Sequence, residues 1–224
     1  MPIGKNYIWL NPVVLQMTEA EERENSLQKL SFEEVHCREN HIETVRKIYR
    51  EAAALEKRRE QQGASHQLLC DVRCPMAVDL VKTQFPQAKV IYPKTLPILV
   101  QSAAELSKRT AAEPEAQLTV ITPCEALCVL GRLQGYPRTV FMTWKAFCRR
   151  YDLHPRMKRQ EQSPIPVGFF AGCAERVVSL DSRESILHFF TEQREAEADI
   201  VEMLYCSGGC HHGEGMLGTE AVWS

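Results

Sequence analysis

Short β-branched runs alternate with amphipathic segments along the chain, and this alternation limits the possible folds more than any other feature. Strands are predicted at 7–10, 32–37, 67–72, 88–92, 117–122, 138–143 and 199–205. Helices are predicted at 18–30, 39–62, 75–85, 97–109, 144–151 and 182–196. A strand–helix–strand rhythm favours parallel sheets covered by helices. We therefore expect an α/β fold made of two lobes, each a parallel sheet flanked by helices.

Local signals support several of these elements. Thr18 is expected to cap the first helix with Glu21 completing a capping box, and Ser182 to cap the last one. Pro75 stands in the first turn of its helix, where proline is favoured. The helix at 39–62 has apolar residues at helical spacing, namely Ile42, Val45, Ile48, Tyr49, Ala52 and Leu55. These residues are expected to form its buried face.

The polar stretch 110–116 is the best boundary between the lobes. It predicts a first lobe at 1–110, a second lobe at 117–217 and a tail at 218–224. The segment 154–166 is charged and contains prolines, which is typical of a solvated connection or a partner contact, and a connection is the simpler interpretation.

Composition excludes some classes of protein. A net charge of −2 gives no basic field for nucleic acid. No apolar run reaches about 18 residues, so no membrane-spanning helix is expected. The first residues lack the apolar stretch of a signal peptide, which predicts a cytoplasmic location.

Nine cysteines need an explanation, and an odd number without an export signal argues against a disulfide framework. Cys148 and Cys37 are interpreted as small buried hydrophobic residues. The others include three C-x3-C pairs: Cys70 with Cys74, Cys124 with Cys128, and Cys206 with Cys210. Each pair lies near the carboxyl end of a predicted strand, which is where ligands bind in parallel sheets.

Three kinds of site could use these thiols. Structural zinc prefers four tetrahedral Cys or His ligands, and His211 and His212 follow Cys210, although most adjacent loop histidines are solvated. A thiol redox or nucleophilic site favours C-x2-C or one activated cysteine. An iron–sulfur cluster takes thiolates from distant loops and needs close backbone approach, which glycines permit. The glycines Gly208, Gly209 and Gly213 in "CSGGCHHGEG" favour the cluster.

The chain resembles the catalytic domain of iron-only (FeFe) hydrogenases. The ending "IVEMLYCSGGCHHGEG" is similar to that family's E-x-M-x-C-P-G-G-C-x-x-G-G-G segment, and "LLCDVRCPMAVDLVKTQFPQ" to its S-C-C-P segment. Weaker similarities occur in "LQKLSFEEVHC", "YPKTLPILVQSA" and "LTVITPCEAL". All of them follow the family's order from about residue 7 to 217.

The resemblance implies a 4Fe-4S cluster in a cleft between two α/β lobes. It makes Cys74, Cys206 and Cys210 cluster ligands, with Cys210 bridging to a diiron centre that carries CO and cyanide. Lys94 matches a lysine that contacts a diiron cyanide.

Three positions depart from the family pattern. Pro93 replaces the second cluster cysteine, Arg73 replaces the proton-relay cysteine, and Glu214 replaces a glycine. Arginine stays protonated and cannot relay protons as a thiol does. These departures argue against a diiron centre. The fourth iron of a cluster would then be bound by water, a non-cysteine residue or another cysteine, for which Cys70 and Cys124 are the candidates.

The sequence thus predicts an iron–sulfur protein on a hydrogenase-like scaffold, in electron transfer or redox sensing. A minimal hydrogenase acting on H2 is the alternative, so an oxidoreductase activity stays open. A metal-free or zinc-binding interaction scaffold is the second alternative. No ferredoxin-like cysteine runs are present, so electrons would come from a redox partner such as a ferredoxin.

Overall fold

A computed structural model describes residues 4–165 and 167–217, and these residues divide into two compact units. Among the described residues, the first unit comprises 4–39, 99–165 and 210–217, and the second comprises 40–98 and 167–209. The predicted contiguous lobes, 1–110 and 117–217, differ from this division, and the predicted tail at 218–224 lies outside the described residues. The physical reason is strand pairing, because each sheet takes strands from two separate stretches of chain.

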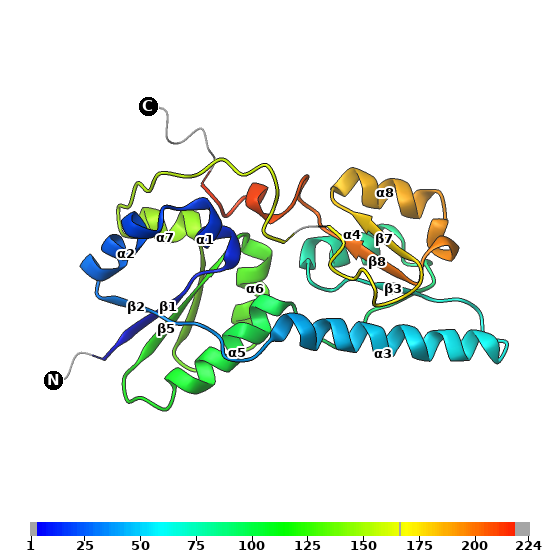
Figure 1. The fold of residues 1–224 in the computed structure, drawn as a ribbon, viewed down its shortest axis with the longest axis horizontal. Coiled ribbons are helices and arrows are strands. Elements are labelled where there is room, and N and C mark those ends of the chain that lie inside the picture. Colours follow the sequence, from blue (N-terminus) through cyan, green and yellow to red (C-terminus); the bar gives the residue numbers. More distant parts are fainter. Residues whose placement is uncertain (1–3, 166, 218–224) are drawn as a thin grey trace. The chain divides into compact units, whose positions relative to one another are not determined.

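The sheet of the first unit has the order β2-β1-β5-β6, and all its strands are parallel. Its strands are β1 (Asn6–Trp9), β2 (Phe32–Glu34), β5 (Gln117–Thr122) and β6 (Thr139–Thr143). Its helices are α1 (Pro12–Met17), α2 (Ala20–Lys29), α5 (Ile98–Thr110, whose first residue is assigned to the second unit), α6 (Glu125–Leu133) and α7 (Trp144–Arg150), with a short 3-10 helix η2 (Cys210–His212). Figure 1 shows the course of these elements.

Alternation along β1 separates two cores in the first unit. Ile8 faces one side of the sheet, where Val14 of α1, Leu27 of α2 and Phe147 of α7 are buried. Tyr7 and Trp9 face the other side, against residues of α5 and α6. This period of two is what a strand covered on both faces requires.

The sheet of the second unit has the order β4-β3-β8-β7 and is also parallel throughout. Its strands are β3 (Leu68–Cys70), β4 (Val90–Ile91), β7 (Val177–Leu180) and β8 (Ile200–Met203). Its helices are α3 (His41–Gln61), α4 (Pro75–Gln84) and α8 (Arg183–Thr191), followed by the 3-10 helix η1 (Arg194–Glu197).

Both faces of this second sheet are covered as well. Leu68 and Cys70 of β3 pack toward α4 and α8, whose buried side chains include Val81 and Phe189. Leu69 points the opposite way, toward Tyr49 of α3. The α/β fold with parallel sheets flanked by helices is therefore confirmed in each unit.

Several local predictions need correction. Thr18 ends α1 rather than capping α2, whose N-cap is Glu19, because the six residues Pro12–Met17 form a separate helix. Two predicted buried positions of α3 are exposed, Ile42 to 54% and Leu55 to 56%, because only the face with Val45 and Tyr49 meets the sheet. Helix α6 and strand β7 were not predicted. Ser182 does cap α8, and Pro75 does open α4.

The membrane prediction can be checked on the described residues. None of their helices combines the length and the apolar character needed to cross a bilayer.

Candidate metal centre

Solvent exposure divides the nine cysteines, none of which is in a disulfide, into two groups. Four are buried, and these are Cys70, Cys128, Cys148 and Cys173. The five partly exposed ones are Cys37 and the four that follow strands: Cys74, Cys124, Cys206 and Cys210. Each of the three C-x3-C pairs was predicted as a unit, but Cys70 and Cys128 belong to the buried group.

Cys74 is the N-cap residue of α4. Burial raises the pKa of the Cys74 thiol, and hydrogen bonds from backbone N–H groups of Ala77, Tyr205 and Met76 oppose that rise. These donors favour the thiolate form, which is the form that binds metals. The N-terminus of α4 adds the positive end of a helix dipole to the same place.

Strand pairing in the second unit brings Cys74 close to the loop that carries Cys206. Strand β3 lies beside β8, with Cys70 opposite Val201. The chain leaves both strands at the same edge of the sheet, so the Tyr205 N–H reaches the Cys74 thiol. Cys206 is the next residue after Tyr205. The second unit by itself therefore places two predicted ligand loops side by side.

Cys70 lies in a different environment from Cys74. Its side chain is fully buried among apolar residues of the core that includes Leu68 and Phe189. Burial raises the pKa of the Cys70 thiol, and the nearby Asp71 carboxylate raises it further. The structure thus gives Cys70 the properties of a core residue.

In the first unit, Cys124 is the N-cap residue of α6 and its side chain forms no capping hydrogen bond. Cys128, one turn later, is fully buried and lies 2.9 Å from the Thr122 hydroxyl. Burial raises the pKa of the Cys128 thiol to about 11. Cys124 is therefore the accessible member of this pair.

The loop after Cys210 packs against the end of β5. The Gly215 N–H donates to the Pro123 carbonyl at 3.1 Å. A Cβ atom on Gly213 would lie 2.5 Å from that same oxygen, so no larger residue fits there. The side chain of Glu214 does not enter this contact, because its carboxylate accepts a hydrogen bond from the Glu125 N–H at 2.8 Å. Glu214 thus caps α6.

Gly208 and Gly209 turn the chain in the loop after Cys206. Both have positive φ angles, 73° and 115°, which favour glycine. Their N–H groups donate to the carbonyls of Asp181 and Cys206, at 3.1 Å and 2.9 Å. The Gly213 N–H donates to the Cys210 carbonyl at 3.0 Å. The cofactor contacts expected for these three glycines remain a prediction, and their observed hydrogen bonds shape the loop.

A buried ionic network lies at the carboxyl end of β3, and the sequence did not reveal it. Arg73 donates from Nε and Nη2 to the Asp71 carboxylate, with the shortest distance 2.8 Å, and from Nη2 to Glu202 at 2.6 Å. Both carboxylates are fully buried. Burial would lower the pKa of Arg73, but the two carboxylates outweigh it and raise that pKa. The only sequence signal was Glu202 within an otherwise apolar strand.

The same arginine is stacked on aromatic rings. Its Cζ atom lies 3.9 Å from the ring centroid of Phe169 and 4.8 Å from that of Phe170. The Glu202 carboxylate holds this segment in place through the N–H groups of Gly168 and Phe169, at 2.7 Å and 3.0 Å. Nη1 of Arg73 is buried without a hydrogen-bond partner among the described residues.

The two positions near the predicted diiron contact lie after β4. Lys94 is exposed, and Pro93, which takes the place of a family cysteine, is partly buried. The contact expected for Lys94 remains a prediction.

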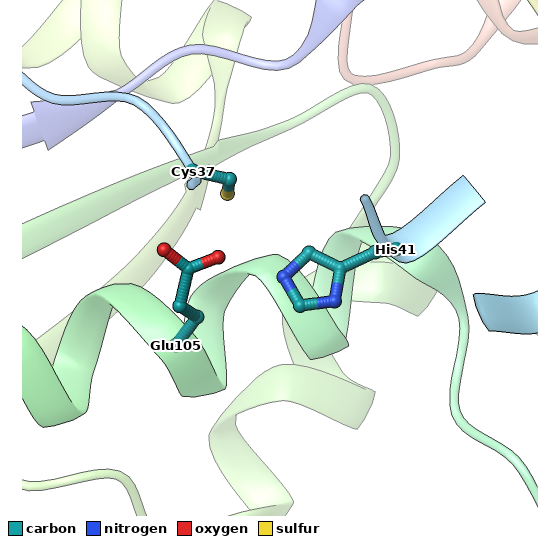
Figure 2. A group of neighbouring side chains, drawn as sticks. All are labelled: Cys37, His41 and Glu105. Atoms are coloured by element: carbon teal, nitrogen blue, oxygen red, sulfur yellow. The ribbon is translucent and has the colours of Figure 1, made fainter. Parts of the chain in front are cut away.

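Figure 2 shows Cys37, His41 and Glu105, three neighbouring side chains with metal-ligating atoms. Cys37 and Glu105 belong to the first unit, and His41 opens α3 of the second. The Glu105 carboxylate accepts hydrogen bonds from the N–H groups of Arg38 and Glu39, at 2.8 Å and 3.2 Å. These bonds give Glu105 a structural role that needs no metal ion.

A single zinc ion needs several ligand atoms close together. Within either unit by itself, the described Cys, His, Asp and Glu side chains form no group of three whose ligand atoms lie within 4.8 Å of one another. A four-iron cluster differs, because its own bulk keeps its thiolate ligands farther apart. Partly exposed thiols that follow strands are donors that an iron–sulfur cluster can use.

Comparisons with known proteins agree with the fold. The sequence matches no protein-family model, and no curated protein matches it. Among solved structures, a variant of FeFe-hydrogenase HydA1 from Chlamydomonas reinhardtii is similar with a TM-score of 0.61 and 12% identity, covering 99% of this chain and 84% of that one. An apo variant of the same enzyme has a TM-score of 0.58 at 12% identity, covering 98% and 82%. The HydA(deltaEFG) structure, described as revealing stepwise H-cluster assembly, has a TM-score of 0.57 at 11% identity, covering 98% and 83%. The chain therefore has a hydrogenase-like fold.

Proposed function

We propose that this chain is an iron–sulfur protein that binds a 4Fe-4S cluster through Cys74, Cys206, Cys210 and Cys124. The hydrogenase-like fold supports an iron–sulfur role, since the similar structures are FeFe-hydrogenases. The cluster would act in electron transfer or redox sensing.

One observation carries the proposal. Burial raises the pKa of the Cys74 thiol, and the backbone N–H groups of Ala77, Tyr205 and Met76 oppose that rise by favouring the thiolate. A cluster ligand must be a thiolate, and hydrogen bonds to its sulfur stabilise that form and tune the cluster. Because Tyr205 directly precedes Cys206, the same contact brings two proposed ligand loops together.

Exposure favours Cys124 over Cys70 as the fourth ligand. Cys70 is fully buried in the core beside Leu68, and binding iron would require that core to open. Cys124 is partly exposed in the loop after β5, and the Cys210 loop packs on its neighbour Pro123.

The proposed role requires a partner that exchanges electrons with the cluster. A ferredoxin or another electron-transfer protein would suit this role, because a cluster changes charge by single electrons. The cluster's thiolates would come from loops at strand ends, where a partner can approach more closely than in a core.

Cysteine substitutions in the whole chain test this proposal. After anaerobic reconstitution with iron and sulfide, we expect about four iron atoms per chain and the broad absorption of a cluster. The Cys206→Ala variant should lose most of the bound iron and most of the cluster absorption. Cys148→Ala is the matched control, because Cys148 is buried in a core and should affect stability but not iron content. A Cys206→Ala protein with wild-type iron content and spectrum would refute the proposal.

A hydrogenase active on H2 is the second candidate, and the fold favours it. Arg73 opposes it, because its side chain is engaged with Asp71 and Glu202 and cannot relay protons. Infrared bands of CO and cyanide after co-expression with maturation proteins would establish a diiron centre, and their absence from a cluster-loaded protein would exclude this candidate.

A further inference from the structure

Arg73 has a donor group that its protein neighbours do not use. The residue is 8% exposed, and its guanidinium binds Asp71 and Glu202 through Nε and Nη2. Nη1 is buried and has no partner among the described residues. A buried donor left unpaired costs about 1–3 kcal/mol, and more when it is charged. An unpaired buried donor needs an explanation, and a role toward a bound group is one.

The surroundings fix the direction of this side chain. The two carboxylates hold one edge of the guanidinium, and its face lies on the ring of Phe169 at 3.9 Å. A planar group held at one edge and one face cannot rotate freely. Nη1 is therefore a fixed donor with constant positive charge, at the residue that precedes Cys74.

Cys74 supplies the chemical context. In the proposed function, which this inference rests on, its sulfur binds an anionic cluster. Arginine hydrogen bonds suit anionic acceptors, and charge and hydrogen bonds near cluster sulfurs raise the reduction potential. We propose that Arg73 donates from Nη1 to a sulfur of the cluster bound by Cys74 and thereby sets a higher reduction potential.

The network has a matched counterpart at the other end of the same sheet. Arg176 precedes β7 and binds Asp199, which precedes β8, with its Nε 3.0 Å from the carboxylate. Both arginines bind an aspartate by a side-on contact within the second unit. Only Arg73 lies at the carboxyl end, where the proposed cluster ligands follow the strands.

The experiment measures the midpoint potential of the reconstituted cluster in the whole chain. Arg73→Gln removes both the charge and the donor, so its potential should fall. Arg73→Lys keeps the charge and removes Nη1, so its potential should fall less. Arg176→Gln should keep the wild-type potential. If Arg73→Gln does not fold, Arg73→Lys decides the question, because lysine still pairs with the carboxylates.

Two results overturn the inference. One is a wild-type potential in each folded Arg73 variant, and the other is an equal shift in Arg176→Gln. Failure of the proposed function is seen separately and earlier, since a wild-type chain that takes up no iron gives no potential to measure. A purely structural role for Arg73 would change the unfolding midpoint of the metal-free chain and leave the potential unchanged.

Discussion

The two sheets link neighbouring strands in the same way but with side chains of different charge. In each, a buried polar side chain follows an inner strand and ties it to the next strand of the sheet. In the first unit Asn11 follows β1 and donates to the Ile121 carbonyl of β5 at 3.0 Å. In the second unit Asp71 follows β3 and accepts from the Met203 N–H of β8 at 3.3 Å.

Their charges differ, and so do their requirements. The amide of Asn11 donates to Ile121 and accepts from the N–H groups of Val13 and Val14, so it is satisfied as a neutral group. The carboxylate of Asp71 needs Arg73 to compensate it. Since a neutral residue can do this structural work, the fold does not require a buried ionic network. Buried ion pairs contribute little net stability, which leaves room for a functional reason.

Replacing Arg73 should have the largest effect on the difference in stability between the two sheets. Arg73→Gln leaves two fully buried carboxylates without their counter-charge, so the free energy of unfolding of the metal-free chain should fall by about 3–5 kcal/mol. Urea titration followed by circular dichroism measures this loss. Adding Glu202→Gln to Arg73→Gln should recover part of the stability, because one unpaired charge disappears. A loss below about 1 kcal/mol in Arg73→Gln would contradict the assigned network.

Asn11→Asp gives the first sheet the charge of the second without its arginine. The new carboxylate would face the Ile121 carbonyl oxygen, and the free energy of unfolding should fall by about 2 kcal/mol at neutral pH. The loss should shrink in acid, because a protonated carboxyl can donate to that carbonyl. Urea titrations at neutral and acid pH measure both effects.

Asn40→Ala provides the matched control for this prediction. Asn40 is an exposed N-cap whose side chain accepts from the Glu43 N–H at 3.0 Å. Its removal should cost about 1 kcal/mol, with no recovery in acid. If the two variants lost the same free energy of unfolding with the same pH dependence, the burial of Asn11 would contribute nothing to the effect of Asn11→Asp.

The pattern of the sequence predicted the strands better than the short helices between them. Strand β5 has the predicted bounds, 117–122, because its alternation is long and β-branched. Helix α1 has six residues, too few for a helical period to be visible. Helix α6 was missed because it has only nine residues and contains Gly131, a poor helix former.

For the candidate site, too, the sequence predicted local features but not contacts between distant residues. Cysteine spacing identified the loops after β3, β5 and β8, because spacing is local. It could not separate Cys74 from the buried Cys70, which differ in whether the side chain lies within the strand or after it. The contact of Arg73 with Glu202 joins residues 129 positions apart, and local patterns contain no information about such a pair.

The amino end of the second sheet offers a milder ionic contact than the carboxyl end. Burial of the Asp199 carboxyl opposes ionisation, but hydrogen bonds from Arg176 outweigh it and lower the pKa of Asp199. A lowered pKa adds stability above the unfolded-state value and loses it as pH falls through the folded-state value. Asp199→Asn should thus reduce the free energy of unfolding by about 1 kcal/mol at neutral pH.

The pH dependence distinguishes this charge effect from a packing effect. The difference between wild type and Asp199→Asn should shrink as the pH falls below the unfolded-state pKa of about 3.9, and it should disappear once the pH passes the lower folded-state pKa. Thermal unfolding of the metal-free chain across this range measures it. A difference that stays constant with pH would show that the charge of Asp199 is irrelevant.

Glu214, which stands where the compared hydrogenase segment has a glycine, gives the smallest expected effect. Its exposed carboxylate accepts from the Glu125 N–H at 2.8 Å and so caps α6. Glu214→Ala should cost about 0.5–1 kcal/mol, and Glu214→Gln less, because an acceptor remains. Since this side chain binds the helix and leaves the packing of Gly213 and Gly215 on Pro123 intact, iron content after reconstitution should stay at the wild-type value in both variants. Reduced iron uptake in Glu214→Ala with unchanged unfolding would mean that the carboxylate acts on the cluster loop rather than on α6.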